Sequence, residues 1–211
     1  MCLNKHIIIV CCVFVAILGN ILTFSYATDK ELVGDYPELL RLKEFDTTLE
    51  LNMPPDISKD DMFPTPSQLN ILFTAIRYCR NDLGKMQDEF PDLFAIFRPE
   101  VLDDLDDDDE LEVVMNLSGY KGDSTWIWIA EPYAGAYRYF EYEDQHRMVT
   151  EVIITKEKEI VLRRPGSKNI PIKGTNNLVT IEFVLQTVIK FTGKTIEVIR
   201  PYEIVDECLI P

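Results

Sequence analysis

Histidine and cysteine are scarce in this chain. Its 211 residues include two histidines and five cysteines, and His146 is the only histidine after residue 27. A zinc ion needs three or four nitrogen, sulfur or carboxylate ligands, and a Ser-His-Asp or Cys-His mechanism needs a histidine base. The scarcity of these side chains argues against zinc chemistry and against nucleophilic catalysis of the usual kinds.

Basic residues are also few compared with acidic ones. The chain has 21 lysines and arginines against 36 aspartates and glutamates, which gives a net charge of −15 and a pI of about 4.5. Such a field keeps a protein soluble, repels nucleic acid and anionic lipid, and attracts basic partners or cations. We therefore expect no nucleic acid partner.

The N-terminal segment Met1–Ala27 has the pattern of an export signal. Lys5 precedes the nearly continuous apolar stretch Ile7–Phe24, and Ser25-Tyr26-Ala27 places small residues where a signal peptidase reads them. We expect cleavage after Ala27, which leaves 20 basic and 36 acidic residues, a net charge of −16, in a periplasmic or secreted protein without stable membrane insertion. The alternative is a retained anchor, because a spanning helix needs only about 20 apolar residues.

Two cysteines follow the signal segment, Cys79 and Cys208. In an oxidising compartment, two cysteines and no third predict one disulfide. The alternative is a buried free cysteine, because Cys79 falls on the apolar face of a predicted helix.

Residues 28–211 have the length and composition of a single globular domain. Its first part, up to residue 66, is expected to be rich in loops, because five prolines interrupt it. Within it, the alternating residues Thr47–Asn52 predict a short strand.

The clearest helix start in the sequence lies at Thr65. This residue can cap the first turn, Pro66 fits the first helical position, and Gln68 completes a capping box. Apolar residues at three- and four-residue spacing continue the helix, and Gly84 is expected to end it. A shorter helix is expected to follow, with four apolar side chains on one face: Phe90, Leu93, Phe94 and Phe97.

The second half of the chain is rich in β-branched and aromatic residues with turn-length gaps. Five strands are predicted, at Leu111–Leu117, Thr125–Ala130, Tyr137–Glu143, Arg147–Thr155 and Glu159–Arg164. Lys156-Glu157-Lys158 is expected to form a hairpin turn, and Pro165-Gly166-Ser167 to close the series. Consecutive strands with short connections favour antiparallel pairing.

The segment Thr180–Phe191 fits a helix with Gly193 as its C-terminal cap, although a long buried strand is the alternative. A final strand is expected at Thr195–Arg200. The expected fold class is therefore α+β, with N-terminal helices packed on a C-terminal, mostly antiparallel sheet.

An acidic loop is expected at residues 100–112, which contain nine acids and no base. Oxygen-rich loops of this kind bind calcium. A calcium-loop frame starting at Asp104 places Asp106 and Asp108 correctly, but Asp109 stands at the glycine position and Met115 at the bidentate glutamate position. We therefore expect a solvated loop and no bound metal, with a looser divalent-cation site as the alternative.

Seven aromatic residues fall within 17 positions of the first predicted hairpin. Trp126 and Trp128 share one face of their strand, as do Tyr137 and Tyr139. Such a face can contact a protein or stack on sugars, or it can pack in the core. Both interpretations are open from the sequence.

These patterns favour an exported, acidic, non-enzymatic binding protein that engages a basic protein partner. An inhibitor or immunity factor against a toxin or hydrolase is one form of this hypothesis. No cofactor is expected. The expected contact residues are aromatic and acidic: Trp126, Trp128, Tyr137, Tyr139, Asp106, Asp107, Asp108 and Asp109.

Two alternatives remain open for the function. A glycan hydrolase needs only two suitably spaced carboxylates, for which Glu131, Glu141 and Glu143 are the candidates. A structural secreted or envelope protein without a defined ligand is the third interpretation.

Overall fold

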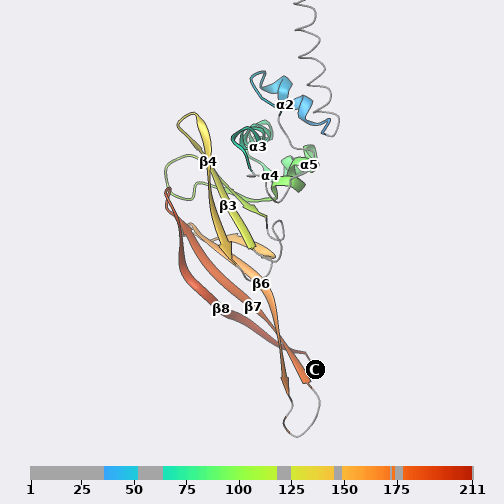
Figure 1. The fold of residues 1–211 in the computed structure, drawn as a ribbon, viewed down its shortest axis with the longest axis vertical. Helices are drawn as coiled ribbons and strands as arrows, with labels where there is room; N and C mark the ends of the chain where they lie inside the picture. The colour runs from blue at the N-terminus through green and yellow to red at the C-terminus, as the bar shows by residue number, and fades with distance from the viewer. Residues whose placement is uncertain are drawn as a thin grey trace, which may run out of the picture.

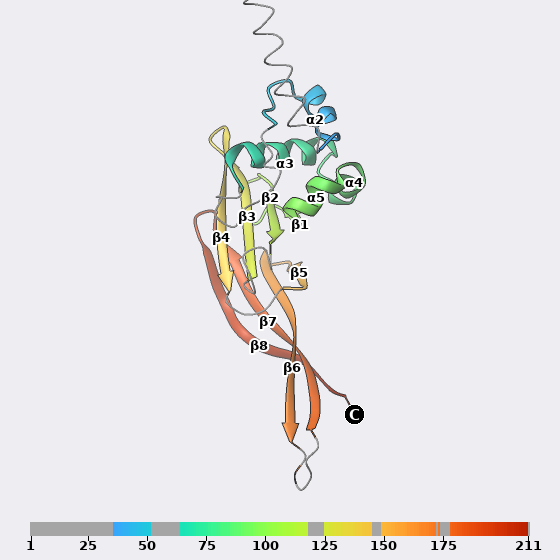
Figure 2. The ribbon, with the colours of Figure 1, turned by 45° about the vertical axis from the view of Figure 1, so that its right-hand side comes forward.

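The computed structural model describes residues 36–51, 64–117, 125–144, 149–171, 173 and 178–210. The predicted signal segment lies outside these residues. Within them the protein is a mixed α+β protein that contains helices and two antiparallel four-stranded sheets (Figures 1 and 2). The sequence had suggested one sheet.

Four described helices precede the strands. They are α2 (Leu39–Phe45), α3 (Pro66–Tyr78), α4 (Leu83–Glu89) and α5 (Pro91–Phe97). The start of α3 confirms the predicted capping box, because the Thr65 hydroxyl accepts the Gln68 backbone N–H at 3.3 Å and the Gln68 side chain accepts the Thr65 N–H at 2.7 Å.

The predicted end of α3 at Gly84 is wrong. The helix ends at Tyr78, and Gly84 lies inside α4. Arg80 and Asn81 both adopt a φ of 60°, which reverses the chain, and the Asp82 carboxylate then caps α4 by accepting the Lys85 N–H at 3.0 Å.

The predicted strand at Thr47–Asn52 is absent from its described part, residues 47–51. The Asp46 side chain accepts both the N–H and the hydroxyl of Thr48, which makes a turn. The alternation in this sequence reflects the burial of Leu49 and Leu51 in the core, without strand pairing.

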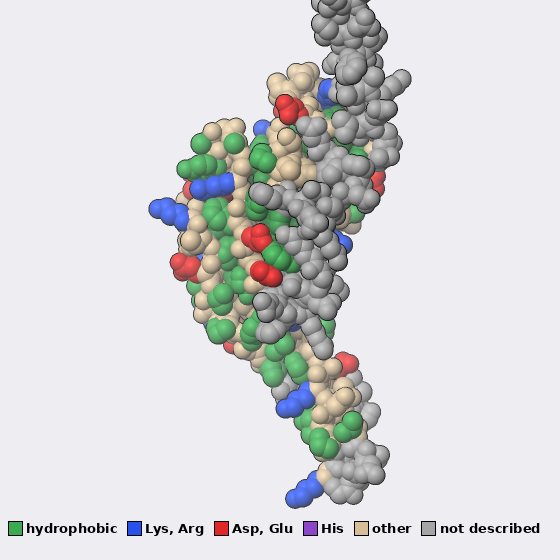
Figure 3. All heavy atoms as spheres, viewed as in Figure 1, with side chains coloured by type: hydrophobic (Ala, Val, Ile, Leu, Met, Phe, Trp, Pro, Cys, Tyr) green, Lys and Arg blue, Asp and Glu red, His purple; other side chains and the backbone are tan. Residues whose placement is uncertain are grey.

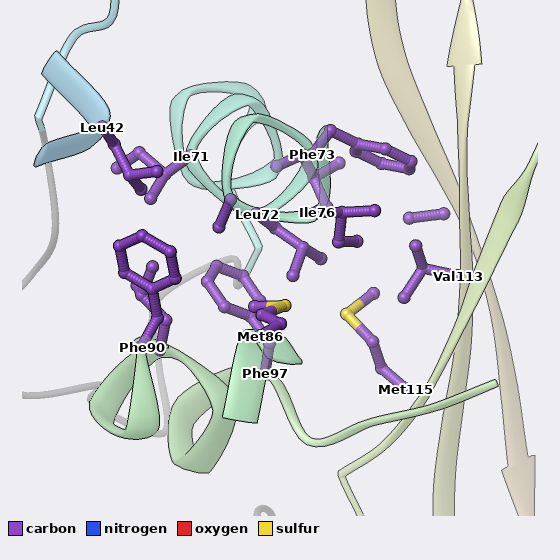
Figure 4. Packing of buried hydrophobic residues seen from close by; sticks show 14 of the residues in the cluster. Leu42, Ile71, Leu72, Phe73, Ile76, Met86, Phe90, Phe97, Val113 and Met115 are labelled. Carbon is purple, nitrogen blue, oxygen red and sulfur yellow. The ribbon is translucent and has the colours of Figure 1, made fainter. Parts of the chain in front are cut away.

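The first sheet has the order β1-β2-β3-β4. Its strands are β1 (Pro99–Asp103), β2 (Glu112–Asn116), β3 (Thr125–Tyr133) and β4 (Ala136–Asp144). The helices pack on one face of this sheet, where Leu72, Met86 and Phe97 share one buried cluster with Val113 and Met115 of β2 (Figure 4).

The second sheet has the order β5-β6-β7-β8 and covers the other face of the first. Its strands are β5 (Glu151–Ile154), β6 (Glu159–Pro171), β7 (Leu178–Phe191) and β8 (Ile196–Ile210). Val114 and Ile129 of the first sheet lie in one buried cluster with Ile160, Leu162 and Ile189 of the second. The protein therefore has three layers: helices, first sheet and second sheet.

The helix expected at Thr180–Phe191 is wrong, because this segment forms most of strand β7. Strand β7 pairs with β6 from Lys190 down to Leu178 and with β8 on its other side. A strand that lies between two others, with part of its length packed in the core, carries apolar residues on both faces. In the sequence, such a run of apolar residues resembles the apolar face of a helix. Gly193, with a φ of 73°, serves the turn between β7 and β8.

The expected end of β6 at Pro165-Gly166-Ser167 is also wrong. The strand continues to Pro171, and Gly166 pairs directly with Phe183 of β7. The final strand likewise runs ten residues past its predicted end at Arg200, to Ile210. These extensions build a projecting ribbon, the C-terminal arm, defined as residues 165–171 of β6, 178–185 of β7 and 201–210 of β8 (Figure 2).

Candidate functional site

The predicted aromatic binding face is part of the core. Trp128 is only 2% exposed and stacks on Tyr139 with ring centroids 4.7 Å apart. Tyr137 stacks on Phe73 of α3 at 4.5 Å, and Trp126 packs against the same cluster. Helix α3 therefore covers this face of β3 and β4, and the core interpretation holds.

The three candidate glutamates of a glycan hydrolase do not form one site. Glu131 points toward the second sheet, is 2% exposed and forms an ion pair with Arg138, its cross-strand neighbour. Glu141 and Glu143 pair in register with Trp128 and Trp126, and so lie on the opposite face of the sheet.

Two opposing effects act on the pKa of Glu131. Burial raises the pKa of its carboxyl, and the Arg138 guanidinium opposes that shift. Arg138 also donates from Nη2 to the Gly193 carbonyl at 2.8 Å. Through Arg138, which is 35% exposed, this ion pair therefore joins the β3–β4 hairpin to the β7–β8 turn.

The predicted disulfide between Cys79 and Cys208 is not formed in this structure. Cys79 is a free cysteine, buried in the helical core cluster. Cys208 lies near the end of β8, opposite Glu182, and Figure 2 places the C-terminus at the end of the molecule away from α3. The alternative interpretation, a buried free thiol at Cys79, agrees with the structure.

The acidic loop connects β1 to β2 and is folded on itself. The two carboxylate oxygens of Asp104 accept the backbone N–H groups of Asp108 at 3.2 Å and Asp109 at 3.3 Å. Lys158, in the predicted β5–β6 turn, donates to the Asp103 carboxylate at 2.9 Å and to the Asp104 carbonyl at 2.6 Å. The loop is thereby attached to the second sheet.

The four expected contact residues of this loop differ in position. Asp107, Asp108 and Asp109 are exposed, whereas Asp106 is partly buried. Asp104, Asp106 and Asp108 bring one carboxylate oxygen each within 4.8 Å of one another. Burial and the neighbouring charges of Asp108 and Asp104 raise the pKa of Asp106.

The sequence interpretation missed an exposed apolar strip on β8. We define the β8 strip as five exposed side chains: Val198, Ile199, Tyr202, Ile204 and Val205. Ile170 and Leu178 add further exposed apolar groups to the C-terminal arm, and hydrophobic side chains are visible along this arm in Figure 3. Tyr202 and Ile204, continued after Asp206 by Cys208 and Ile210, recur at two-residue spacing and would have favoured a longer strand.

Within the described parts of the chain, no helix is both long and apolar enough to cross a membrane. Comparisons with known protein families, with curated proteins and with solved structures found no match to this chain.

Proposed function

We propose that this protein is an exported, non-enzymatic binding protein and that it contacts a basic protein partner through the β8 strip. The observation that supports this proposal most directly is the exposure of the strip. Val198 and Ile204 are 50% and 52% exposed, although both are aliphatic. Single exposed apolar residues are ordinary, but several on one strand are typical of a protein contact surface.

The tyrosine of the strip, Tyr202, is in contact with a buried arginine. Arg164 is 1% exposed, donates to the Thr187 hydroxyl at 3.0 Å, and its guanidinium lies 4.3 Å from the centroid of the Tyr202 ring. Such a cation–π contact fixes the ring. A pre-positioned tyrosine among aliphatic residues has the character of an interface hot spot.

The outer edge of β8 does not favour addition of a partner strand. The pairing of β8 with β7 shifts register at three places, between Val184 and Leu185, between Gln186 and Val188, and between Val188 and Ile189. Such irregularities increase twist and are a common protection of edge strands. We therefore expect the partner to contact the side chains of the strip.

Charge supplies the second part of the proposal. Exposed Glu197 and Glu203 lie on the same strand as the strip, and the exposed Arg200 between them is paired with Glu159, in a chain of net charge −15. Complementary charge accelerates association and selects against acidic partners. An inhibitor or immunity factor for a basic toxin or hydrolase would fit this surface.

The proposal is tested by affinity capture of the partner from the exported fraction of the host. The wild type is compared with a Val198→Ser/Ile204→Ser variant, and with Leu40→Ser as a matched control, because Leu40 is a 50% exposed aliphatic residue on α2. We expect the strip variant to lose the partner and the control to retain it, with capture weakening at high salt.

Two results would contradict the proposal. One is equal capture by the strip variant and the wild type. The other is a change of oligomeric state in light scattering, in which the wild type is a dimer and the strip variant is a monomer. The strip would then contact a second copy of this chain.

A further inference from the structure

The spacing of three carboxylates in the acidic loop matches a cation coordination sphere. One oxygen each from Asp104, Asp106 and Asp108 lies within 4.8 Å of the others. Calcium binds oxygen ligands at about 2.3–2.6 Å, so two ligands of one ion can be no more than about 5 Å apart. Acidic loops often have no bound ion, however, so spacing alone does not establish a site.

The second observation is a buried carboxylate beneath the loop. Glu112, the first residue of β2, is 0% exposed. Its Oε2 accepts the Leu105 backbone N–H at 2.5 Å, which places the carboxyl group directly against the loop. Its other oxygen, Oε1, is buried and has no hydrogen-bond partner among the described residues. A buried carboxylate oxygen without a donor is strongly disfavoured unless a proton or a cation compensates it.

Asp106, a member of the cluster, also has a carboxylate oxygen without a hydrogen-bond donor within the described part of the chain. This atom, Oδ1, is buried. Burial raises the pKa of Glu112 most, the Leu105 N–H bond opposes this shift, and the charges of Asp106, Glu131 and Asp108 add to it, to about 8 in all. Two buried carboxylate oxygens at this loop, Asp106 Oδ1 and Glu112 Oε1, therefore lack a hydrogen-bond donor among the described residues.

The sequence has aspartate, Asp109, where a calcium loop has glycine, but the backbone there has the conformation that such a loop needs. Asp109 adopts this left-handed conformation with a φ of 69°. Met115 faces the helical core, so it supplies no ligand. Glu112, at the ninth position of the same frame, contacts the loop through the Leu105 N–H.

We propose that Asp104, Asp106 and Asp108 bind one Ca²⁺ ion, with the buried Glu112 carboxyl group beside the loop as a further negative charge. The set consists of oxygen donors alone, which suits a hard cation and excludes a preference for zinc or copper. Calcium fits this site better than magnesium, because it accepts variable geometry on a loop, whereas magnesium requires a near-ideal octahedron. We expect a dissociation constant of about 0.1–1 mM, the range of extracellular calcium modules.

The test is a titration of the purified, EDTA-treated protein with CaCl₂, followed by isothermal calorimetry and by the melting temperature. Asp108→Asn, Asp106→Asn and Glu112→Gln are compared with Asp107→Asn. The control removes the same charge from the same loop, at an exposed residue outside the cluster. Asn tolerates the φ of 64° at this position.

We expect the wild type to bind about one Ca²⁺ and to melt at a higher temperature in its presence. Asp106→Asn and Asp108→Asn should weaken binding about tenfold or more, and Asp107→Asn less than about threefold. Asp108 is exposed, so its variant should keep the native circular dichroism spectrum even if Glu112→Gln does not fold.

Three outcomes would overturn the site. The first is no heat and no change in melting temperature up to about 10 mM CaCl₂. The second is an equal loss of binding in Asp107→Asn and Asp106→Asn, which would indicate general charge screening. The third is equal affinity for Mg²⁺, which would contradict the assignment of calcium.

Discussion

At the scale of single residues, Cys79 shows how burial changes the meaning of a sequence feature. Export predicts an oxidising compartment, and two cysteines there predict a disulfide. In the structure Cys79 is 0% exposed and free, in the cluster that joins the helices to the first sheet. Its place on the apolar face of the predicted helix was the better guide, because a buried thiol behaves as a small hydrophobic side chain.

We predict that the Cys79 thiol is unreactive in the folded protein. Burial raises its pKa, which lowers the thiolate fraction, and no part of the side chain is accessible to reagent. Iodoacetamide should leave Cys79 unlabelled in native buffer and label it in denaturant without reductant, as measured by mass spectrometry. A Cys79 peptide linked to Cys208 under non-reducing conditions would contradict the structure.

At the scale of secondary-structure elements, starts were easier to predict than ends. The α3 start depends on the local contacts of Thr65 and Gln68, which the sequence shows directly. The continuation of β6 through Pro165-Gly166-Ser167 depends on its partner β7, which lies on the other side of a hairpin. A breaker motif was outweighed there by long-range pairing.

We predict that Gly166→Ala destabilises the C-terminal arm. A Cβ at this position would lie 2.1 Å from a ring atom of Phe183, its direct cross-strand neighbour, so the ring has to move. Overpacking of this kind costs about 1–3 kcal/mol, measurable by urea unfolding. In a Phe183→Leu background the same substitution should cost much less, which a double-mutant cycle would show. Equal costs in both backgrounds would contradict the contact.

At the scale of the whole molecule, apolar packing between layers holds together a chain with a large negative charge. Two apolar clusters hold three layers, while the chain carries a net charge of −15. Arg138, which pairs with Glu131 and donates to the Gly193 carbonyl, joins two hairpins, and the Lys158 contacts attach the acidic loop to the second sheet. The C-terminal arm lies beyond these layers, and several of its apolar side chains, among them Leu178, Ile204 and Val205, are exposed.

We predict that salt stabilises the folded protein. Repulsion within an acidic chain destabilises its compact state, and the Debye length falls from about 30 Å to about 10 Å between 0.01 and 0.1 M salt. The melting temperature should therefore rise with NaCl in buffer containing EDTA, which excludes calcium. Screening of exposed pairs such as Arg163–Glu151 should matter little. A melting temperature that falls with NaCl would contradict the prediction.

The sequence by itself determined the α+β class, the start of α3, most of the strands of the first sheet and the scarcity of catalytic side chains. These properties depend on composition, capping and periodicity, which are local. Only the tertiary structure decided that Trp128 is core, that β7 is a strand and that Asp106 and Glu112 each have a buried oxygen without a donor among the described residues. Burial and pairing depend on what packs opposite a residue, and that partner is distant in the chain.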